Sequence, residues 1–141
     1  MGDLSKNLSR HEFACKCGCG FDIVDHDLVR VLQATADWFY ANATSDYRRV
    51  ARVSITINSG CRCPAHNKRE GGSKNSRHMQ GNAADFKVKY VNADGSKKQI
   101  DPDKVADYLD RKFPNQYGVG WYRGRTHFDA SSSGRRRWDM R

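Results

Sequence analysis

Two stretches in which apolar and polar residues alternate constrain the fold of this chain most strongly. The first covers residues 50–60 and ends at Ser59 and Gly60, and the second begins at Ala84. The residues on the apolar side are Ala51, Val53, Ile55 and Ile57 in the first stretch, and Phe86, Val88 and Tyr90 in the second. A period of two is typical of a strand with one buried face. We therefore expect a sheet that is covered on one side.

Two stretches with helical periodicity are the expected cover. Residues 25–43 carry core-type side chains three and four positions apart, with Asp25 at the N-cap. Residues 101–113 begin with Asp101 and Pro102, a capping residue followed by a proline suited to the first turn. The core-facing residues are Leu28, Val31, Leu32, Thr35 and Phe39 in the first helix, and Val105, Tyr108, Leu109 and Phe113 in the second.

Shorter elements complete the predicted architecture. A short helix should begin at Pro64, the turn "NADG" should lead into a strand "KKQI" to make a hairpin, and "YGVGWY" and "THFDA" should be strands joined at "RGR". The order predicts an α+β fold: one small domain over residues 1–141, with an antiparallel sheet and helices on one face. The tail, residues 131–141, is expected to be flexible and basic.

The charge of the chain bears on its partners. It has 25 Lys and Arg against 16 Asp and Glu, a net charge of +9. A basic balance indicates an anionic partner, such as nucleic acid or bacterial cell-wall polymers, or serves solubility alone. No nucleic-acid-binding motif supports the first of these. No apolar run approaches the ~20 residues of a membrane span, and no signal peptide is evident at the N-terminus, so synthesis in the cytoplasm is expected.

Five cysteines form two groups, "CKCGC" (Cys15, Cys17, Cys19) and "CRC" (Cys61, Cys63). Without a signal peptide, a disulfide framework is not expected, and clustered thiols then more often bind metal or stay reduced. The C-x-C-x-C spacing is tighter than the usual C-x-x-C zinc knuckle. A structural zinc, a disulfide and reduced thiols packed as small apolar residues all remain open.

The stretch "SRHMQGNAADFKV" contains His78 and, at the start of the second alternating run, Asp85. Either could be an ordinary surface residue by itself. His127 in "THFD" adds a second histidine, with Asp129 on the same side of its strand. Two histidines and a carboxylate are the ligand types of a catalytic zinc site, which leaves a fourth position for water. Such a site can hydrolyse amides without a side-chain nucleophile.

The motifs around these residues resemble those of the M15 zinc peptidases, in particular the D-Ala-D-Ala carboxypeptidase-like branch often found in phages. The central motif matches "INSGCRCPAHNKREGGSKNSRHMQGNAADF", the last motif "YGVGWYRGRTHFDA", and the N-terminal segment "HEFACKCGCGFDIVDHDLVRVLQATADWF". The resemblance covers most of the chain. It implies a hedgehog/D-Ala-D-Ala-peptidase-like fold with a zinc site on the concave face of an antiparallel sheet.

The resemblance also implies roles for single residues. His78, Asp85 and His127 match the three zinc ligands of the family. Arg62, in S-G-C-R, matches an arginine that contacts the substrate and the developing oxyanion, for which a guanidinium is well suited. Ser76 matches a serine of the substrate cleft, although a serine that caps a loop would look the same.

The chain departs from the family pattern where the general base is expected. Relatives often carry an acid three residues before the last zinc histidine, or a histidine two residues before it, but here those positions hold Gly124 and Arg125. Asp129 is one candidate for the base, and its alternative role is to orient a zinc ligand. Tyr122 and His66 are further candidates if they reach the site.

Two other positions carry expectations of their own. Cys61 stands where relatives usually have tyrosine, so that Cys61 and Cys63 flank Arg62. Trp121 and Tyr122 precede the last predicted strand, and Tyr122 is expected to line the cleft for a peptide stem. Packing in the core is the alternative for both aromatic residues.

The sequence thus predicts a zinc-dependent peptidase that cleaves an amide bond in the stem peptide of peptidoglycan, as a carboxypeptidase or an endopeptidase. The lack of a signal peptide and of an appended wall-binding domain favours a phage lysin or virion-associated wall hydrolase, released to the cell wall by lysis or carried on the virion, and a monomer is expected. A bacterial cytoplasmic carboxypeptidase is the other enzyme interpretation. The alternative is a catalytically inactive, zinc-stabilised module that binds the wall or another partner. The missing acid before His127 is its main support.

Overall fold

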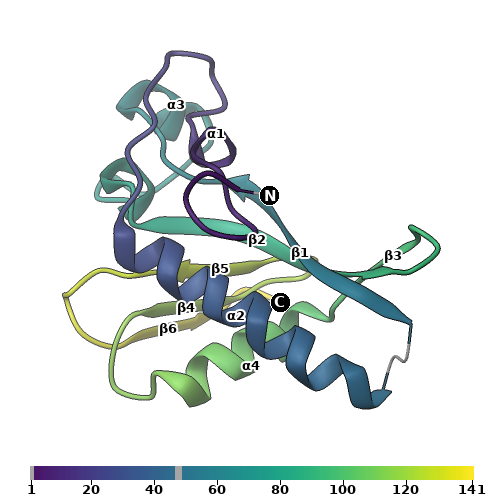
Figure 1. Cartoon of the computed structure of the whole chain (residues 1–141). Coiled ribbons are helices and arrows are strands. Elements are labelled where there is room, and N and C mark those ends of the chain that lie inside the picture. Colours follow the sequence, from purple (N-terminus) through teal and green to yellow (C-terminus); the bar gives the residue numbers. More distant parts are fainter. Residues whose placement is uncertain (1, 47–48) are drawn as a thin grey trace.

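A six-stranded sheet forms the centre of the molecule (Figure 1). The computed structural model describes residues 2–46 and 49–141, without the side chains of residues 44–46. In chain order the strands are β1 (Val50–Ser59), β2 (Ala83–Asn92), β3 (Lys97–Gln99), β4 (Gly118–Trp121), β5 (Thr126–Asp129) and β6 (Arg136–Asp139). They lie in the order β1-β2-β5-β4-β6, and β3 pairs with β2 outside that path. All pairs are antiparallel except β4–β6, which is parallel, so the sheet is mixed rather than purely antiparallel.

The helices confirm the predicted α+β class. They are α1 (Arg10–Phe13), α2 (His26–Asp46), α3 (Pro64–Arg69), the 3-10 helix η1 (Arg77–Gln80) and α4 (Pro102–Lys112). The two long helices cover one face of the sheet, where α2 contacts β1 and β2, and α4 contacts β2, β4 and β5 (Figure 1).

Both long helices begin where capping predicts. A side-chain oxygen of Asp25 accepts a hydrogen bond from the Asp27 N–H at 2.7 Å, and Asp101 does the same for the Asp103 N–H at 3.0 Å. Each cap satisfies a backbone donor that has no partner inside the helix. The short helix predicted at Pro64 is α3, with Pro64 in its first turn.

Alternation along β2 and β5 separates the core from the opposite face of the sheet. Ala84, Phe86 and Phe128 are fully buried in the hydrophobic core that α2 and α4 cover. Neighbouring residues of a strand point to opposite faces. Asp85 and His127 therefore lie on the face away from these helices.

The C-terminal segment differs from the expected flexible tail. Residues 136–139 form β6, which pairs in parallel with β4. The guanidinium of Arg137 donates to the carbonyl oxygens of Phe113 (2.5 Å) and Tyr117 (2.7 Å) and to Asp110 Oδ1 (2.7 Å). The two carbonyl groups come shortly after the end of α4, so these bonds attach the C-terminal segment close to the end of that helix. The prediction of a frayed tail was therefore wrong for this part of it.

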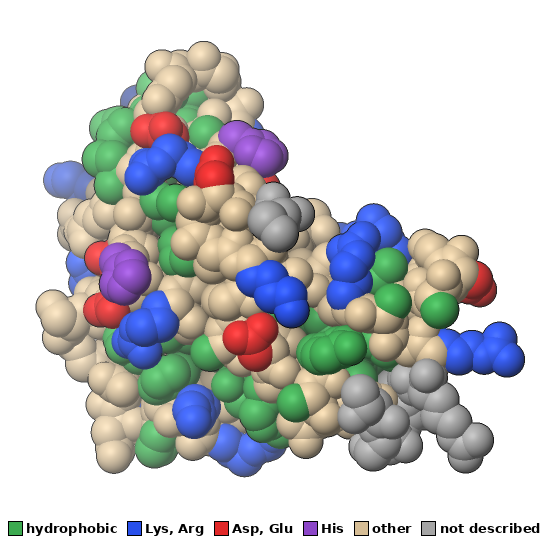
Figure 2. All heavy atoms as spheres, viewed as in Figure 1, with side chains coloured by type: hydrophobic (Ala, Val, Ile, Leu, Met, Phe, Trp, Pro, Cys, Tyr) green, Lys and Arg blue, Asp and Glu red, His purple; other side chains and the backbone are tan. Residues whose placement is uncertain are grey.

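The surface that carries α2 and α4 shows charges of both signs. In Figure 2, Lys and Arg side chains are spread over this face, with Asp and Glu side chains between them. Among the described residues, this face therefore offers no continuous basic stripe of the kind that follows a nucleic-acid backbone. Within the described part of the chain, no helix has both the length and the apolar character needed to cross a bilayer.

Candidate metal centre and cleft

The candidate site is built where β2 and β5 pair. Asp85 on β2 and His127 on β5 are directly opposite each other in the antiparallel register. His78 lies in η1, just before β2, and is brought back over the strands by Gly81, which ends η1 in a left-handed conformation with φ of 70°. A Cβ at Gly81 would lie 2.5 Å from the Ile23 carbonyl oxygen, so only glycine fits this turn.

The three predicted ligands converge in the structure. His78 Nε2 lies 3.3 Å from Asp85 Oδ2, and His127 Nδ1 lies 2.9 Å from Asp85 Oδ1. The relative exposures of His78, Asp85 and His127 are 4%, 8% and 8%. One ligand atom from each residue falls within 4.8 Å of the others, a spacing suited to a single metal ion. The stretch between His78 and Asp85 thus places both side chains at the same point, as the sequence predicted.

Hydrogen bonds orient both imidazole rings. His78 Nδ1 lies 2.6 Å from the Gly60 carbonyl oxygen, which can only accept, so Nδ1 carries a proton and Nε2 is the nitrogen directed at Asp85 and available to a metal ion. His127 lies between two carboxylates, with Nδ1 2.9 Å from Asp85 Oδ1 and Nε2 3.3 Å from Asp129 Oδ2. A proton kept on Nε2 when a metal ion binds would leave Nδ1 as the ligand atom. Arg136 in turn donates to both oxygens of Asp129, at 3.0 and 2.6 Å. Such partners fix the tautomer and orientation of metal-binding histidines.

The electrostatics of the cluster favour a bound cation. Burial alone would raise the pKa of Asp85, but hydrogen bonds with His127 and His78 outweigh it and hold that pKa well below its usual range. Burial also opposes charge on His127, yet contacts with Asp129 and Asp85 raise its pKa. The pKa of Asp129 is lowered by His127 and Arg136, against the effect of burial. Two buried carboxylates thus call for positive charge, which a proton on His127 or a metal ion can supply.

A cleft opens over these residues. One part has a volume of about 520 Å³ and is lined by all three members of the cluster, and an adjoining part of about 480 Å³ is lined by Asp85. Arg62, Glu70 and Arg125 line both parts as well. The lining is therefore rich in guanidinium groups around a buried His/Asp/His cluster.

Arg62 lies at the edge of the cluster. Its Nη2 is 3.5 Å from Asp85 Oδ2, its Nε donates to Ser59 Oγ at 3.1 Å, and its Nη1 donates to Asn67 Oδ1 at 3.1 Å. A Cβ at Gly72 would clash with Asn67 Oδ1 and lie 2.9 Å from Arg62 Nη1. The glycine pair after α3 therefore allows the chain to close over the guanidinium.

The other predicted site residues take different places. Ser76 lines the cleft, and its Oγ also accepts from the His78 N–H at 3.2 Å, so it caps η1. Tyr122 lines the cleft, and its hydroxyl accepts from Trp138 Nε1 at 2.8 Å. His66 lines only the part of the cleft farther from His78, and its Nε2 lies 3.6 Å from Glu70 Oε1.

Residues outside the predicted set complete the surroundings of the site. Trp138 lies against His127 with ring centroids 4.9 Å apart, and Arg136 holds Asp129. Both residues belong to β6. They are two positions apart, which is the period of a strand, so the sequence did contain a signal for a strand in the expected tail. Glu70 lines the whole cleft but follows α3 in an irregular segment, where no pattern predicts its orientation.

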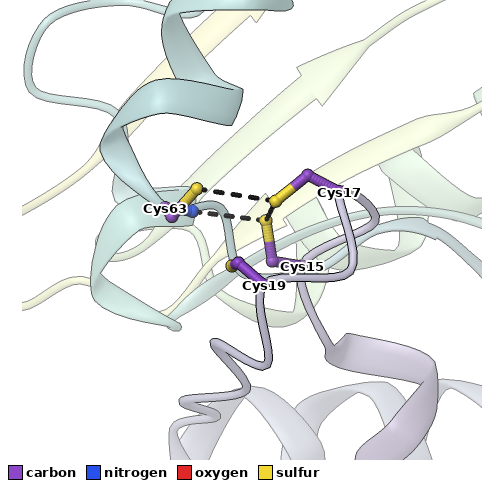
Figure 3. Close-up of side chains that lie close together, drawn as sticks. All are labelled: Cys15, Cys17, Cys19 and Cys63. Carbon is purple, nitrogen blue, oxygen red and sulfur yellow. Dashed lines mark hydrogen bonds between the residues drawn. The ribbon is translucent and has the colours of Figure 1, made fainter.

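A second group of potential metal ligands lies apart from the first. It consists of Cys15, Cys17, Cys19 and Cys63, here called the four-cysteine cluster (Figure 3). Cys61 does not belong to it, because its thiol is buried and donates to the Phe21 carbonyl oxygen at 2.9 Å. The predicted set of five cysteines was therefore one residue too large.

Comparison with known proteins gives one match. A protein-family model described as Peptidase M15 matches residues 6–129, which include both the His/Asp/His cluster and the four-cysteine cluster. Comparisons with curated proteins and with solved structures found no match.

Proposed function

The chain belongs to the M15 peptidase family, and on that premise we propose that it is a zinc-dependent peptidase that hydrolyses an amide bond in the stem peptide of peptidoglycan. The observation that carries the proposal is the convergence of His78, Asp85 and His127 in a cleft that also contains Arg62. The donor set of two nitrogens and one carboxylate oxygen is the kind that binds a catalytic zinc with one position left open.

The roles of the cleft residues follow from their contacts. Zinc bound to His78, Asp85 and His127 would polarise a carbonyl and lower the pKa of a bound water toward about 7. Arg62 is held over Asp85 by Ser59 and would donate to the carbonyl oxygen of the scissile bond as negative charge develops there. Because these groups are already fixed by hydrogen bonds, little reorganisation is needed during the reaction.

Asp129 is better placed to orient His127 than to act as the general base. Both of its oxygens are engaged by Arg136, one of them also contacts His127, and the residue is 1% exposed. A general base must reach the water it deprotonates. We therefore propose Glu70 as the base. Its side chain is 57% exposed and lines both parts of the cleft. None of the contacts described for Glu70 joins it to Arg136 or to the histidines of the cluster.

The charge of the cleft supports an anionic peptide as the substrate. Arg62, Arg77, Arg125 and Arg136 line the part over the cluster, and Lys16, Lys87 and Arg123 line the adjoining part. Stem peptides of peptidoglycan carry free carboxylates, which guanidinium groups bind well. The net charge of +9 would also concentrate the protein on anionic wall polymers.

The competing function is that of a zinc-stabilised module that binds the wall without turnover. Incubation with purified peptidoglycan, with and without a chelator, separates the two, because hydrolysis of an amide releases new amines. The proposal predicts release by the wild type that the chelator and His78→Ala abolish. Equal release by the wild type and by His78→Ala would contradict it, as would binding to the wall without any release.

A further inference from the structure

The four-cysteine cluster brings two separate segments of the chain together. Three of its members lie in the loop after α1, in the five-residue segment 15–19. The fourth, Cys63, lies 44 positions beyond Cys19, at the start of α3. Figure 3 shows the sulfur atoms of Cys15 and Cys17 directed toward Cys63, with Cys19 beside them. The cluster is therefore a contact between the N-terminal loop and the turn that carries Arg62.

The sulfur positions fit a tetrahedral ion. The Sγ atoms of Cys15 and Cys17 are 3.4 Å apart, those of Cys17 and Cys63 are 3.7 Å apart, and all four lie within 4.8 Å of one another. Zinc–sulfur bonds of about 2.3 Å in a tetrahedron place the sulfurs about 3.8 Å apart. Four thiols without an ion have no comparable reason to gather at this spacing.

The backbone around the cluster is arranged for thiolate sulfur. The N–H of Cys63 points to Cys15 Sγ at 3.4 Å, and the N–H of His66 points to Cys63 Sγ at 3.4 Å. Gly18 and Gly20 have φ angles of 81° and 88°, so they allow the loop to turn sharply enough to present its three cysteines to one point. Hydrogen bonds to the ligands from surrounding groups are a regular feature of metal sites.

Packing does not account for Cys17 and Cys19. Cys17 and Cys19 are exposed, whereas a free cysteine used as a small apolar residue is normally buried, as Cys61 is. A single disulfide would use only two of the four thiols. A single ion uses all four.

We propose that the four-cysteine cluster binds one structural zinc ion, which fastens the loop after α1 to the turn that carries Arg62. Four thiolates fill the coordination sphere, so this ion has no open position for chemistry. The same turn is tied further by the Cys61 N–H, which donates to the Phe13 carbonyl at 2.8 Å, and by the Arg62 N–H, which donates to the His78 carbonyl at 2.9 Å. The ion would therefore stabilise the fold and hold the Arg62 backbone in register with His78.

The proposal is independent of peptidase activity and is tested by counting metal. Purified wild type should contain two zinc ions per chain, His78→Ala one, Cys17→Ser one, and the double variant none. Cys61→Ser is the matched control, since it alters a neighbouring thiol outside the cluster, and it should keep two. Equal zinc in wild type and Cys17→Ser would overturn the proposal, whereas equal zinc in wild type and His78→Ala would count only against the His/Asp/His site. The two sites therefore fail separately.

A second measurement does not depend on the folding of any cysteine variant. Cobalt added to metal-free His78→Ala should produce the intense near-ultraviolet absorption of thiolate-to-cobalt charge transfer, and zinc should abolish it. Zinc should also protect the cluster thiols of wild type from alkylation, and chelation should expose them. Absence of the cobalt band, iron in place of zinc, or a disulfide among the four cysteines in the intact native chain would overturn the proposal.

Discussion

Arg136 binds both carboxylate oxygens of Asp129, at 3.0 and 2.6 Å, and thereby connects the last strand of the sheet to the candidate metal centre. Asp129 contacts His127 Nε2 at 3.3 Å through one of the same oxygens. The orientation of His127 therefore depends on a residue nine positions beyond it, in a segment that the sequence marks as solvent-exposed. Predictions about stability, metal affinity and catalysis follow from this arrangement.

Arg136→Ala should destabilise the metal-free protein by about 3 kcal/mol, because Asp129 is 1% exposed and would lose its two-pronged partner, keeping only the 3.3 Å contact with His127. Arg135→Ala is the matched control, since its guanidinium is 52% exposed and its removal should cost less than about 1 kcal/mol. Urea unfolding in the presence of a chelator measures both. Equal losses for the two variants would mean that the ion pair with Asp129 contributes nothing specific.

Asp129→Asn and Glu70→Gln should have different effects. Asp129→Asn alters the partner of His127 and should weaken zinc binding by about 10–100-fold. Glu70→Gln should keep full zinc content and lower kcat by about 10²–10⁴-fold, since it removes the proposed base. Chelator competition and peptidoglycan hydrolysis separate the two effects. If Glu70→Gln retained wild-type kcat, the base would be another group of the cleft.

Arg62→Ala should lower kcat by about 10²–10³-fold, the usual cost of removing one donor to a developing oxyanion. Zinc content should stay at the wild-type level, because Arg62 approaches Asp85 only at 3.5 Å and is not one of the three ligands. Arg123→Ala, which removes a guanidinium from the edge of the cleft, is the control and should change KM more than kcat. The opposite pattern, with Arg62→Ala affecting only KM, would assign Arg62 to substrate binding alone.

The fold was predictable wherever periodicity reflects burial. The alternation of Val53, Ile55 and Ile57 predicts β1, and the spacing along residues 25–43 predicts α2, because in both cases the apolar side chains face the core. The His/Asp/His cluster was also predictable, since its members are reactive side chains at family spacing. Periodicity and motif spacing are both contained in a single sequence.

The remaining features depend on contacts between distant segments. Arg135, Arg136 and Arg137 look like a solvated basic run, but two of them bind groups whose position is set only when the sheet forms, namely Asp129 and the carbonyls that follow α4. Cys61 and Cys63 are equally spaced from Arg62, yet only Cys63 reaches the four-cysteine cluster. Tertiary structure decides which way each of these side chains turns.

The most direct test of the account is the zinc content and peptidoglycan hydrolysis of His78→Ala beside His66→Ala. Both variants remove an imidazole that lines the cleft, but only His78 contacts Asp85 in the cluster. The account predicts that His78→Ala has one zinc fewer than wild type and releases no new amines, while His66→Ala keeps its zinc. Wild-type zinc content and hydrolysis in His78→Ala would contradict it.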